Sequence, residues 1–242
     1  MVLNLNNNLL WRCPTARMLE HYDAHVSERH LDAGVGSGYF LDHCRFPGVS
    51  PHIALVDLNP NTLVFVRERI RRYADVTLYR RNILKPLRIP EKFDSIGISY
   101  LLHCLPGLIE DKAVTVFENL KGCLNPGGVV FGSTLLYDLS MKHFFARLAL
   151  DVYQRSGAMS NRWDTLAGLE TALKRSFSAT SSTPSAAPRS SPAAREPRVP
   201  RFTAARRSAR CGDSRGMMTV RPGLPTRSNV QTIVRRRRLL SR

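Results

Sequence analysis

The sequence predicts an α/β protein built on a doubly wound, mostly parallel β-sheet. One observation is a run of three glycines, Gly34, Gly36 and Gly38, that directly follows an apolar segment. Another is a second apolar segment, residues 53–56, that ends in an acid, Asp57. A third is the alternation of apolar and amphipathic segments over the first half of the chain. This alternation is typical of parallel strands joined by right-handed helical crossovers.

The glycine segment has the sequence of a nucleotide-binding turn between a strand and a helix. Glycines let the backbone turn tightly and approach a ligand that any Cβ would push away. Asp57 follows Gly34 by roughly 20 residues, the interval at which an acid accepts hydrogen bonds from a ribose. We therefore expect an adenosine-type ligand.

The same segment discriminates among adenosine-type ligands. A dinucleotide site needs its third glycine one place after Gly38, where Tyr39 stands. Asp32, two residues before Gly34, adds a negative charge that repels a pyrophosphate and favours a cation. The alternative interpretation is a glycine turn in an α/β protein of another kind.

The first predicted elements surround the glycine turn. Thr15 caps a helix that covers the mouth of the turn. A strand over residues 31–34 leads into the glycines, and a helix begins at Ser37. A second strand over residues 52–57 is followed by a helix that starts at an Asn-Pro pair, residues 59–60. Four arginines of that helix are interpreted as a solvated face rather than a nucleic-acid surface: Arg67, Arg69, Arg71 and Arg72.

The rest of the predicted domain continues the alternation. Residues 93–102 are almost continuously apolar, as expected of a strand buried on both faces of a parallel sheet. A turn at residues 125–128 starts the next strand, and Asp164 caps the last helix. In order, the remaining elements are strands at 76–79 and 93–102, a helix around 113–120, a strand at 129–136, and helices around 144–152 and 166–177.

With these motifs the chain resembles the class I S-adenosylmethionine-dependent methyltransferases, whose first motif has the form acid-x-G-x-G-x-G. It is similar to the small bacterial and fungal enzymes of the methyltransferase type 11/12 group. Those enzymes also carry segments like Trp11–Thr15, Leu101–Pro106 and Leu124–Gly128. The resemblance implies a Rossmann-like methyltransferase fold with S-adenosylmethionine as cofactor, bound at the carboxyl ends of the strands.

The resemblance also implies which residues bind the cofactor. The acid and the three glycines of the motif would surround its methionine part, the acid after the second strand would hold the ribose, and the next residue would flank the adenine. An amide after the third strand would lie near the adenine amino group, and the end of the fourth strand would lie beneath the reacting methyl. In this chain these residues are Asp32, Gly34, Gly36, Gly38, Asp57, Leu58, Asn82, Ser99 and Tyr100.

Methyl transfer from a sulfonium requires mainly that two reactants be held in line in a dry pocket. His103 follows the fourth strand and is a candidate general base, because its ordinary pKa suits that role. The alternative is that His103 packs against the cofactor or substrate. Trp11 and Tyr22 either line the substrate pocket or anchor the amino-terminal helix. We expect no metal site, since no histidines or cysteines stand at ligand spacing.

The chain changes character after Phe177. The net charge is +17, and residues 178–242 hold fifteen arginines, no lysine and two acids, so this segment alone carries +13. We therefore divide the chain into a methyltransferase domain at residues 1–177 and a disordered Arg/Pro/Ser-rich tail at residues 178–242. The run Arg235–Arg238 is interpreted as incidental charge, with nucleic-acid binding only nonspecific and salt-sensitive.

The resembled enzymes continue after the fifth strand with a hairpin that completes a seven-stranded sheet. We find no such strands in this tail and expect the sheet to lack its last two strands. A shifted reading frame, an unspliced segment and true divergence would each produce such a tail.

The cysteines and the amino-terminal segment indicate the cellular compartment. Five cysteines are widely spaced, which suggests reduced thiols rather than a disulfide framework. No secretory signal or membrane-spanning run is visible. We expect a cytoplasmic protein without a membrane partner, and the sequence does not indicate an oligomeric state.

The predicted function is methyl transfer from S-adenosylmethionine to a small-molecule metabolite of secondary metabolism. The resembled enzymes that methylate amino groups of nucleic acids carry an N-P-P-Y-type tetrapeptide after the fourth strand, and Ser99–Leu102 replaces it here. This favours an oxygen or carbon nucleophile. The alternative function is a catalytically impaired cofactor-binding protein whose Arg-rich tail binds nucleic acid nonspecifically.

Overall fold

The computed structural model describes residues 15–137, 152–155, 157, 159–177, 215–220 and 230–233. Trp11, the run Arg235–Arg238 and most of the predicted helix around 144–152 lie outside these residues. Each helix within the described residues is too short or too polar to span a lipid bilayer.

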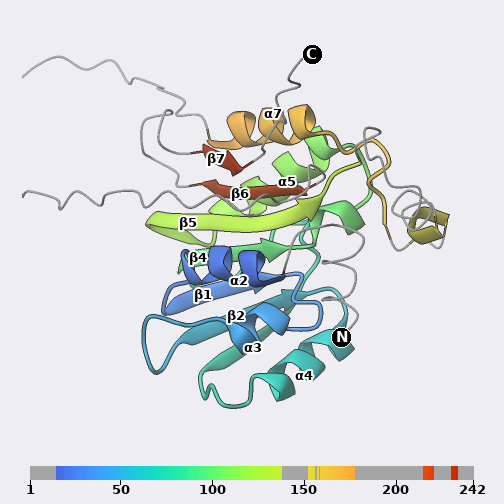
Figure 1. The fold of residues 1–242 in the computed structure, drawn as a ribbon. Coiled ribbons are helices and arrows are strands. Elements are labelled where there is room, and N and C mark those ends of the chain that lie inside the picture. Colours follow the sequence, from blue (N-terminus) through green and yellow to red (C-terminus); the bar gives the residue numbers. More distant parts are fainter. Residues whose placement is uncertain are drawn as a thin grey trace, which may run out of the picture. The chain divides into compact units, whose positions relative to one another are not determined.

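Helices and strands alternate along the chain (Figure 1). The strands are β1 (Arg29–Ala33), β2 (His52–Asp57), β3 (Val76–Arg80), β4 (Phe93–Ser99), β5 (Leu124–Leu135), β6 (Arg215–Val220) and β7 (Val230–Ile233). The helices are α2 (Thr15–Asp23), α3 (Tyr39–His43), α4 (Pro60–Arg69), the 3-10 helix η2 (Leu102–Cys104), α5 (Ile109–Lys121) and α7 (Leu166–Phe177).

The strands form one open sheet in the order β3-β2-β1-β4-β5-β6-β7. Strands β1 to β5 are parallel, and β6 and β7 are antiparallel to their neighbours. The order reverses at β1, between β2 and β4, so the carboxyl ends of these strands border the crevice where open α/β sheets bind ligands. This arrangement confirms the predicted doubly wound, mostly parallel sheet.

Helices cover both faces of the sheet, and each face has its own apolar core. Successive residues of a strand point to opposite faces. Leu31 and Ala33 of β1 therefore pack on the side of α5 and α7, and Ile53 and Leu55 of β2 pack on the side of α2, α3 and α4. Figure 1 shows these three helices in front of the sheet. Asp32, between Leu31 and Ala33, points toward α2.

The expectation that the sheet lacks its last two strands is wrong. β6 pairs with β5 from Val130↔Val220 to Leu135↔Arg215, and β7 pairs with β6. Met218 of β6 is 1% exposed and belongs to the core on the α5 side. β6 covers what would otherwise be an exposed edge of β5, which is the physical reason that a short strand distant in sequence forms there.

One helix start and one helix cap differ from the predictions. The helix after the glycines begins at Tyr39, with Gly38 as its N-cap, rather than at Ser37. The last helix is capped by Thr165, whose Oγ1 accepts the Gly168 N–H at 3.1 Å, and not by Asp164. The carboxylate of Asp164 instead lies 2.8 Å from a buried lysine Nζ.

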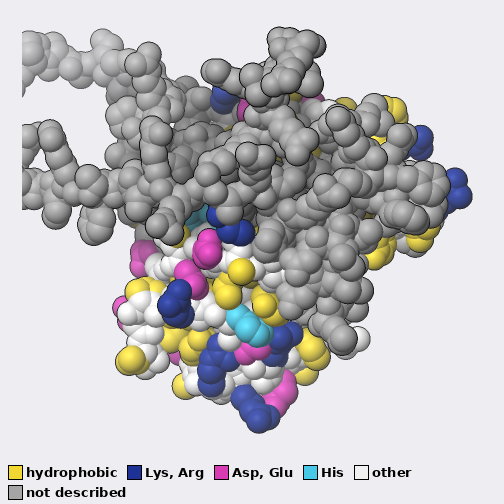
Figure 2. Space-filling view, in the orientation of Figure 1, with side chains coloured by type: hydrophobic (Ala, Val, Ile, Leu, Met, Phe, Trp, Pro, Cys, Tyr) yellow, Lys and Arg dark blue, Asp and Glu magenta, His cyan; other side chains and the backbone are white. Residues whose placement is uncertain are grey.

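The arginines of α4 and of the turn after it lie at the surface, where two of them also form ion pairs. Arg69 Nε donates to Asp42 Oδ2 at 2.9 Å, and Arg72 NH1 lies 2.5 Å from Asp42 Oδ1. Asp42 belongs to α3, so these ion pairs join α3 to α4. In Figure 2 the described part of this surface carries basic and acidic side chains side by side.

Candidate active site

The turn after β1 carries three glycines at positive φ, 71° at Gly34, 51° at Gly36 and 66° at Gly38. A Cβ on Gly34 would lie 2.6 Å from Leu101 Cδ1, and one on Gly38 would lie 2.7 Å from Val66 Cγ1. At Gly36 the nearest atom would be the carbonyl oxygen of Gly34 at 4.0 Å. The turn is therefore packed at its two ends and open at its centre.

Asp32 stands at the carboxyl end of β1, directly before this turn, and is 7% exposed. Its Oδ1 accepts a hydrogen bond from Tyr22 Oη at 3.1 Å. Burial raises the pKa of Asp32 to about 7; Asp57 raises it as well, while the Tyr22 hydrogen bond opposes the shift. A cation beside Asp32 would favour its ionised form.

Asp57 ends β2, the strand that pairs with β1. Its Oδ1 accepts the backbone N–H of Asn59 at 2.8 Å, which fixes the carboxylate at the start of α4. Among the described residues, no hydrogen bond reaches its Oδ2. Leu58, the next residue, is 62% exposed. The half-buried carboxylate thus keeps acceptor capacity for a hydroxyl-bearing ligand.

The backbone turns sharply where β4 ends. Tyr100 has φ 60°, a conformation that is strained for a bulky residue and that concentrates at functional sites. Its N–H donates to the Ser133 carbonyl at 2.8 Å, and its Oη donates to Met18 Sδ at 2.9 Å. Ser99 directly precedes this turn, and Leu101 follows it against Gly34. The predicted cofactor residues of β1 and β4 therefore lie together.

His103 lies in η2 and is 3% exposed. Its Nδ1 accepts the Leu135 N–H at 3.4 Å and lies 3.5 Å from Thr134 Oγ1. In the neutral ring this contact assigns the proton to Nε2. The backbone carbonyl of His103 accepts the Ser160 N–H at 2.8 Å. His103 therefore joins the end of β4 to β5 and to the segment before α7.

The other predicted site residues have different surroundings. Asn82 Oδ1 accepts the Leu84 N–H at 3.0 Å within a local turn after β3. Tyr22 is 1% exposed, bonds to Asp32 and stacks on Phe40 at 5.5 Å between ring centroids. These contacts favour the anchoring interpretation of Tyr22 over a lining of the substrate pocket. Trp11 lies outside the described residues.

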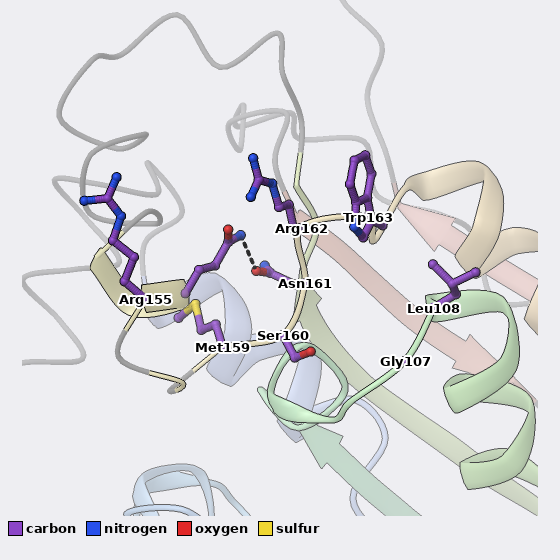
Figure 3. A pocket seen from close by; sticks show the side chains of 9 residues that line it. Gly107, Leu108, Arg155, Met159, Ser160, Asn161, Arg162 and Trp163 are labelled. Carbon is purple, nitrogen blue, oxygen red and sulfur yellow. Dashed lines mark hydrogen bonds between the residues drawn. The ribbon is translucent and has the colours of Figure 1, made fainter.

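A cavity of about 560 Å³ lies beside the first turn of α5 (Figure 3). None of the predicted cofactor residues lines this cavity. The sequence did not indicate it, because its lining comes from two segments about 50 positions apart. Gln154 donates to Asn161 across one side at 3.3 Å. The lining residues are Gly107, Leu108, Gln154, Arg155, Met159, Ser160, Asn161, Arg162 and Trp163.

The residues at the glycine turn fit S-adenosylmethionine. A Cβ on Gly36 would project into open space, and two acids, Asp32 and Asp57, lie at the carboxyl ends of the neighbouring strands β1 and β2. Asp32 would face the positively charged methionine part, and Asp57 would accept hydrogen bonds from the ribose. The cofactor would supply an electrophilic methyl group on its sulfonium.

The doubly wound sheet and the glycine turn at its switch point define the class of Rossmann-like nucleotide-binding proteins. Residues 31–130 match the family described as methyltransferase domain. The demethylluteothin O-methyltransferase of Streptomyces thioluteus is 39% identical over 170 residues, which cover 70% of this chain and 73% of that protein. The physcion biosynthesis cluster O-methyltransferase of Aspergillus chevalieri is 38% identical over 179 residues, 73% of this chain and 79% of that protein. This chain belongs to the class I S-adenosylmethionine-dependent methyltransferases.

Solved structures agree in fold. A possible exported protein from Bordetella parapertussis aligns with a TM-score of 0.51 and 18% identity, covering 66% of this chain and 59% of that one. A geranyl diphosphate methyltransferase in complex with S-adenosylmethionine aligns with a TM-score of 0.50 and 16% identity, covering 68% of this chain and 65% of that one. At these identities the likeness concerns the arrangement of the sheet and its helices.

Proposed function

We propose that this methyltransferase transfers the methyl group of S-adenosylmethionine to an oxygen atom of a small-molecule acceptor. The observation that carries the proposal is the pair of interacting carboxylates, Asp32 near the end of β1 and Asp57 at the end of β2, at the edge of the sheet where β1 leads into the glycine turn. An anionic site next to an unobstructed turn is complementary to a cationic nucleoside.

Each residue has a distinct role in this proposal. Asp57 holds the ribose, and Asp32 stabilises the positive charge of the methionine part. The strained turn at Tyr100 and the neighbouring Leu101 shape the floor beneath the methyl group. Because an in-line displacement gains most from orientation, these positioning contacts supply the larger part of catalysis.

The choice of an oxygen acceptor has two supports. The relatives from Streptomyces thioluteus and Aspergillus chevalieri are both described as O-methyltransferases. In addition, the segment at the end of β4 reads Ser99–Leu102 where nucleic-acid amino methyltransferases carry an N-P-P-Y-type tetrapeptide. A metabolite hydroxyl, as in a phenol or enol, is therefore the proposed acceptor.

His103 has two proposed roles, general base and packing residue. A base at Nε2 would need the ring proton on Nδ1, where it would face the Leu135 N–H. Two donors facing each other are unfavourable, because the Leu135 N–H would lose its acceptor on the ring. The contacts of His103 therefore favour packing, with an acidic hydroxyl of the acceptor losing its proton to solvent.

We propose that the methyltransferase domain comprises residues 1–177 together with β6 and β7, and the pairing of these strands in the sheet supports this division. The alternative of an impaired cofactor-binding protein depended on the loss of those strands. Their pairing with β5 removes that argument. A cytoplasmic location and a tail that binds nucleic acid only nonspecifically remain part of the proposal.

Calorimetry and mass spectrometry test the function. We expect the full chain to bind one S-adenosylmethionine and to convert a phenol or enol from an acceptor panel to its methyl ether. Asp57→Ala should weaken cofactor binding roughly 30-fold, the loss expected for hydrogen bonds to a charged acceptor. The matched control is Asp94→Ala, an exposed acid near the start of β4 that bonds to Asn125. Absence of cofactor binding by the wild-type chain, or methylation of amines alone, would contradict the proposal.

A further inference from the structure

A continuous chain of hydrogen bonds runs through the protein from the half-buried Ser27 to Asp32. Ser27 Oγ lies 2.7 Å from Ser95 Oγ, which lies 2.8 Å from His30 Nδ1. His30 Nε2 lies 2.7 Å from Tyr22 Oη, which bonds to Asp32 Oδ1 at 3.1 Å. We call these five side chains the relay. Four of them are buried, and one end of the relay is the carboxylate at the proposed cofactor site.

The relay follows from the register of the sheet. His30 and Asp32 are two residues apart in β1 and share the face under α2. His30 pairs with Ser95 of β4, and Asp32 pairs with Gly97. A Cβ on Gly97 would lie 2.8 Å from Asp32 Oδ1 and 3.2 Å from Tyr22 Oη. Glycine at this position therefore leaves the space in which the tyrosine and the carboxylate meet.

Proton counting allows one arrangement when Asp32 is ionised. The carboxylate only accepts, so Tyr22 donates its single proton to it. His30 must then donate from Nε2 to the tyrosine oxygen, and its Nδ1 accepts the proton of Ser95. Ser95 also accepts the backbone N–H of Ser27 at 2.9 Å. The protons of Ser95, His30 and Tyr22 therefore all point toward Asp32.

The opposite arrangement fits a protonated Asp32. The carboxylic acid donates to Tyr22, which donates to His30 Nε2, and His30 donates from Nδ1 to Ser95. Ser95 donates to Ser27 Oγ, and Ser27 donates to the Arg29 carbonyl at 2.9 Å. Every acceptor is again satisfied. The two arrangements differ in the tautomer of a neutral histidine and in one proton at Asp32.

We propose that the relay ties the charge of Asp32 to the tautomer of His30, so that a cation bound beside Asp32 drives one proton out along the relay to solvent at Ser27. In that step the Asp32 proton passes to Tyr22, the tyrosine proton to His30 Nε2, the Nδ1 proton to Ser95 and the Ser95 proton to Ser27, whose own proton leaves to water. Tyr22, His30 and Ser95 are thus positioning residues. The link to the cofactor rests on the proposed function, whereas the coupling within the relay does not.

The groups around Asp32 allow this behaviour near neutral pH. Burial, together with Asp57, raises the pKa of Asp32 to about 7. Burial lowers the pKa of His30 to about 3, so its ring stays neutral and only its tautomer can change. Burial also raises the pKa of Tyr22 and of Cys44, the other groups that interact with Asp32, so both keep their protons. Of Tyr22, His30, Asp32 and Cys44, Asp32 is the group whose pKa lies near neutral pH.

The first test needs no cofactor. In the ¹⁵N-labelled full chain, ring nitrogen shifts report which nitrogen of His30 carries the proton, with His30→Gln used to assign the signals. We expect Nδ1–H below the titration of Asp32 and Nε2–H above it, with a midpoint near pH 7. A single tautomer throughout pH 5.5–8.5 would overturn the proposal.

The second test measures S-adenosylmethionine affinity against pH by calorimetry. Affinity should rise as pH passes the midpoint, because the ionised form of Asp32 binds the cation. Tyr22→Phe removes the hydrogen bond that lowers the Asp32 pKa, so the midpoint should move up by about one pH unit and binding at pH 6.5 should weaken roughly tenfold. Ser95→Ala should move the midpoint in the same direction.

Two matched variants separate this effect from general damage. Tyr79→Phe removes a hydroxyl that bonds to Glu91, and Ser133→Ala removes a buried hydroxyl that has no hydrogen bond among the described residues. Neither should move the midpoint. An equal loss of affinity at every pH for Tyr22→Phe would contradict the relay. If the wild-type chain bound no S-adenosylmethionine, the proposed function would fail while the His30 titration still decided the coupling.

Discussion

The ring of His103 accepts the Leu135 N–H at Nδ1. A substitution that keeps this acceptor tests whether the residue packs or acts as a general base. His103→Asn keeps an acceptor for the Leu135 N–H but cannot take up a proton near neutral pH. If His103 packs, kcat should stay within about threefold of wild type, since general bases contribute roughly 10²–10⁴-fold. The measurement is kcat over pH 6–9 with the acceptor that the panel identifies. A loss of about 100-fold at unchanged cofactor affinity, with the acidic limb of the pH profile gone, would instead assign the base to His103.

At the same scale, the glycine motif shows what sequence can and cannot predict. The spacing of Gly34, Gly36 and Gly38 predicted a tight turn beside a ligand, and all three have positive φ. Only Gly36 borders open space, whereas Gly34 and Gly38 make room for Leu101 and Val66. Those neighbours come from other elements, so local spacing could not distinguish a glycine kept for packing from one kept for a ligand.

The relay residues His30 and Ser95 were missed for a related reason. They lie 65 positions apart and meet only through the register of β1 and β4. A histidine two residues before the motif acid, on the same face of the strand, was the one local signal. The sequence therefore predicts Asp32 as a site residue but not the side chains that set its charge.

At the scale of elements, a buried ion pair fixes the wall of the cavity in Figure 3. Lys112 of α5 lies 2.8 Å from Asp164 Oδ2, and both side chains are at most 2% exposed. Lys112 Nζ also donates to the Leu105 and Ser160 carbonyls at 3.0 and 2.9 Å. One buried cation thus joins α5 to the η2 segment and to the segment before α7, although the sequence suggested only a helix cap at Asp164.

Lys112→Met should lower the free energy of unfolding by about 3–5 kcal/mol at pH 7.5, because it leaves Asp164 buried without its partner. Burial already raises the pKa of Asp164 to about 6 against the opposing effect of Lys112, so the pKa should rise further without the lysine. The penalty should therefore shrink as pH falls through the folded-state pKa and the carboxyl becomes neutral. Urea denaturation at pH 5.5 and 7.5 measures both values.

The control for this pair is the double variant Lys112→Met with Asp164→Leu. Removing both charges should recover a large part of the lost stability, since a buried ion pair and an apolar pair of similar volume are often comparable. Additive losses in the double variant would show that the two side chains stabilise the fold independently.

For the whole molecule, the first five strands and their doubly wound, mostly parallel arrangement were predictable because each strand has a local sequence signal. Apolar runs end in turns or acids, and right-handed crossovers then leave few arrangements. β6 was not predictable in this way, since Arg215–Val220 contains glycine and arginine and follows a long Pro-rich segment. Its strand conformation depends on the unpaired edge that β5 offers, and that edge exists only once the rest of the sheet has formed.

This dependence leads to a prediction about the end of the chain. Ending the protein after Phe177 removes β6 and β7, exposes β5 as an edge and uncovers the core around Met218. Truncation also removes two contacts to α2 and to the turn after it. One is the Met218 carbonyl, 3.3 Å from His21 Nε2, and the other is Thr219 Oγ1, 3.3 Å from His25 Nε2. The free energy of unfolding should fall by on the order of 3 kcal/mol, from one buried Met and several hydrogen bonds, and the truncated chain should aggregate on heating.

The matched control ends after Ile233, which keeps both strands and removes the basic run Arg235–Arg238; its melting temperature should equal that of the full chain. Equal stability and equal S-adenosylmethionine affinity for all three chains would show that β6 and β7 contribute nothing to the folded domain.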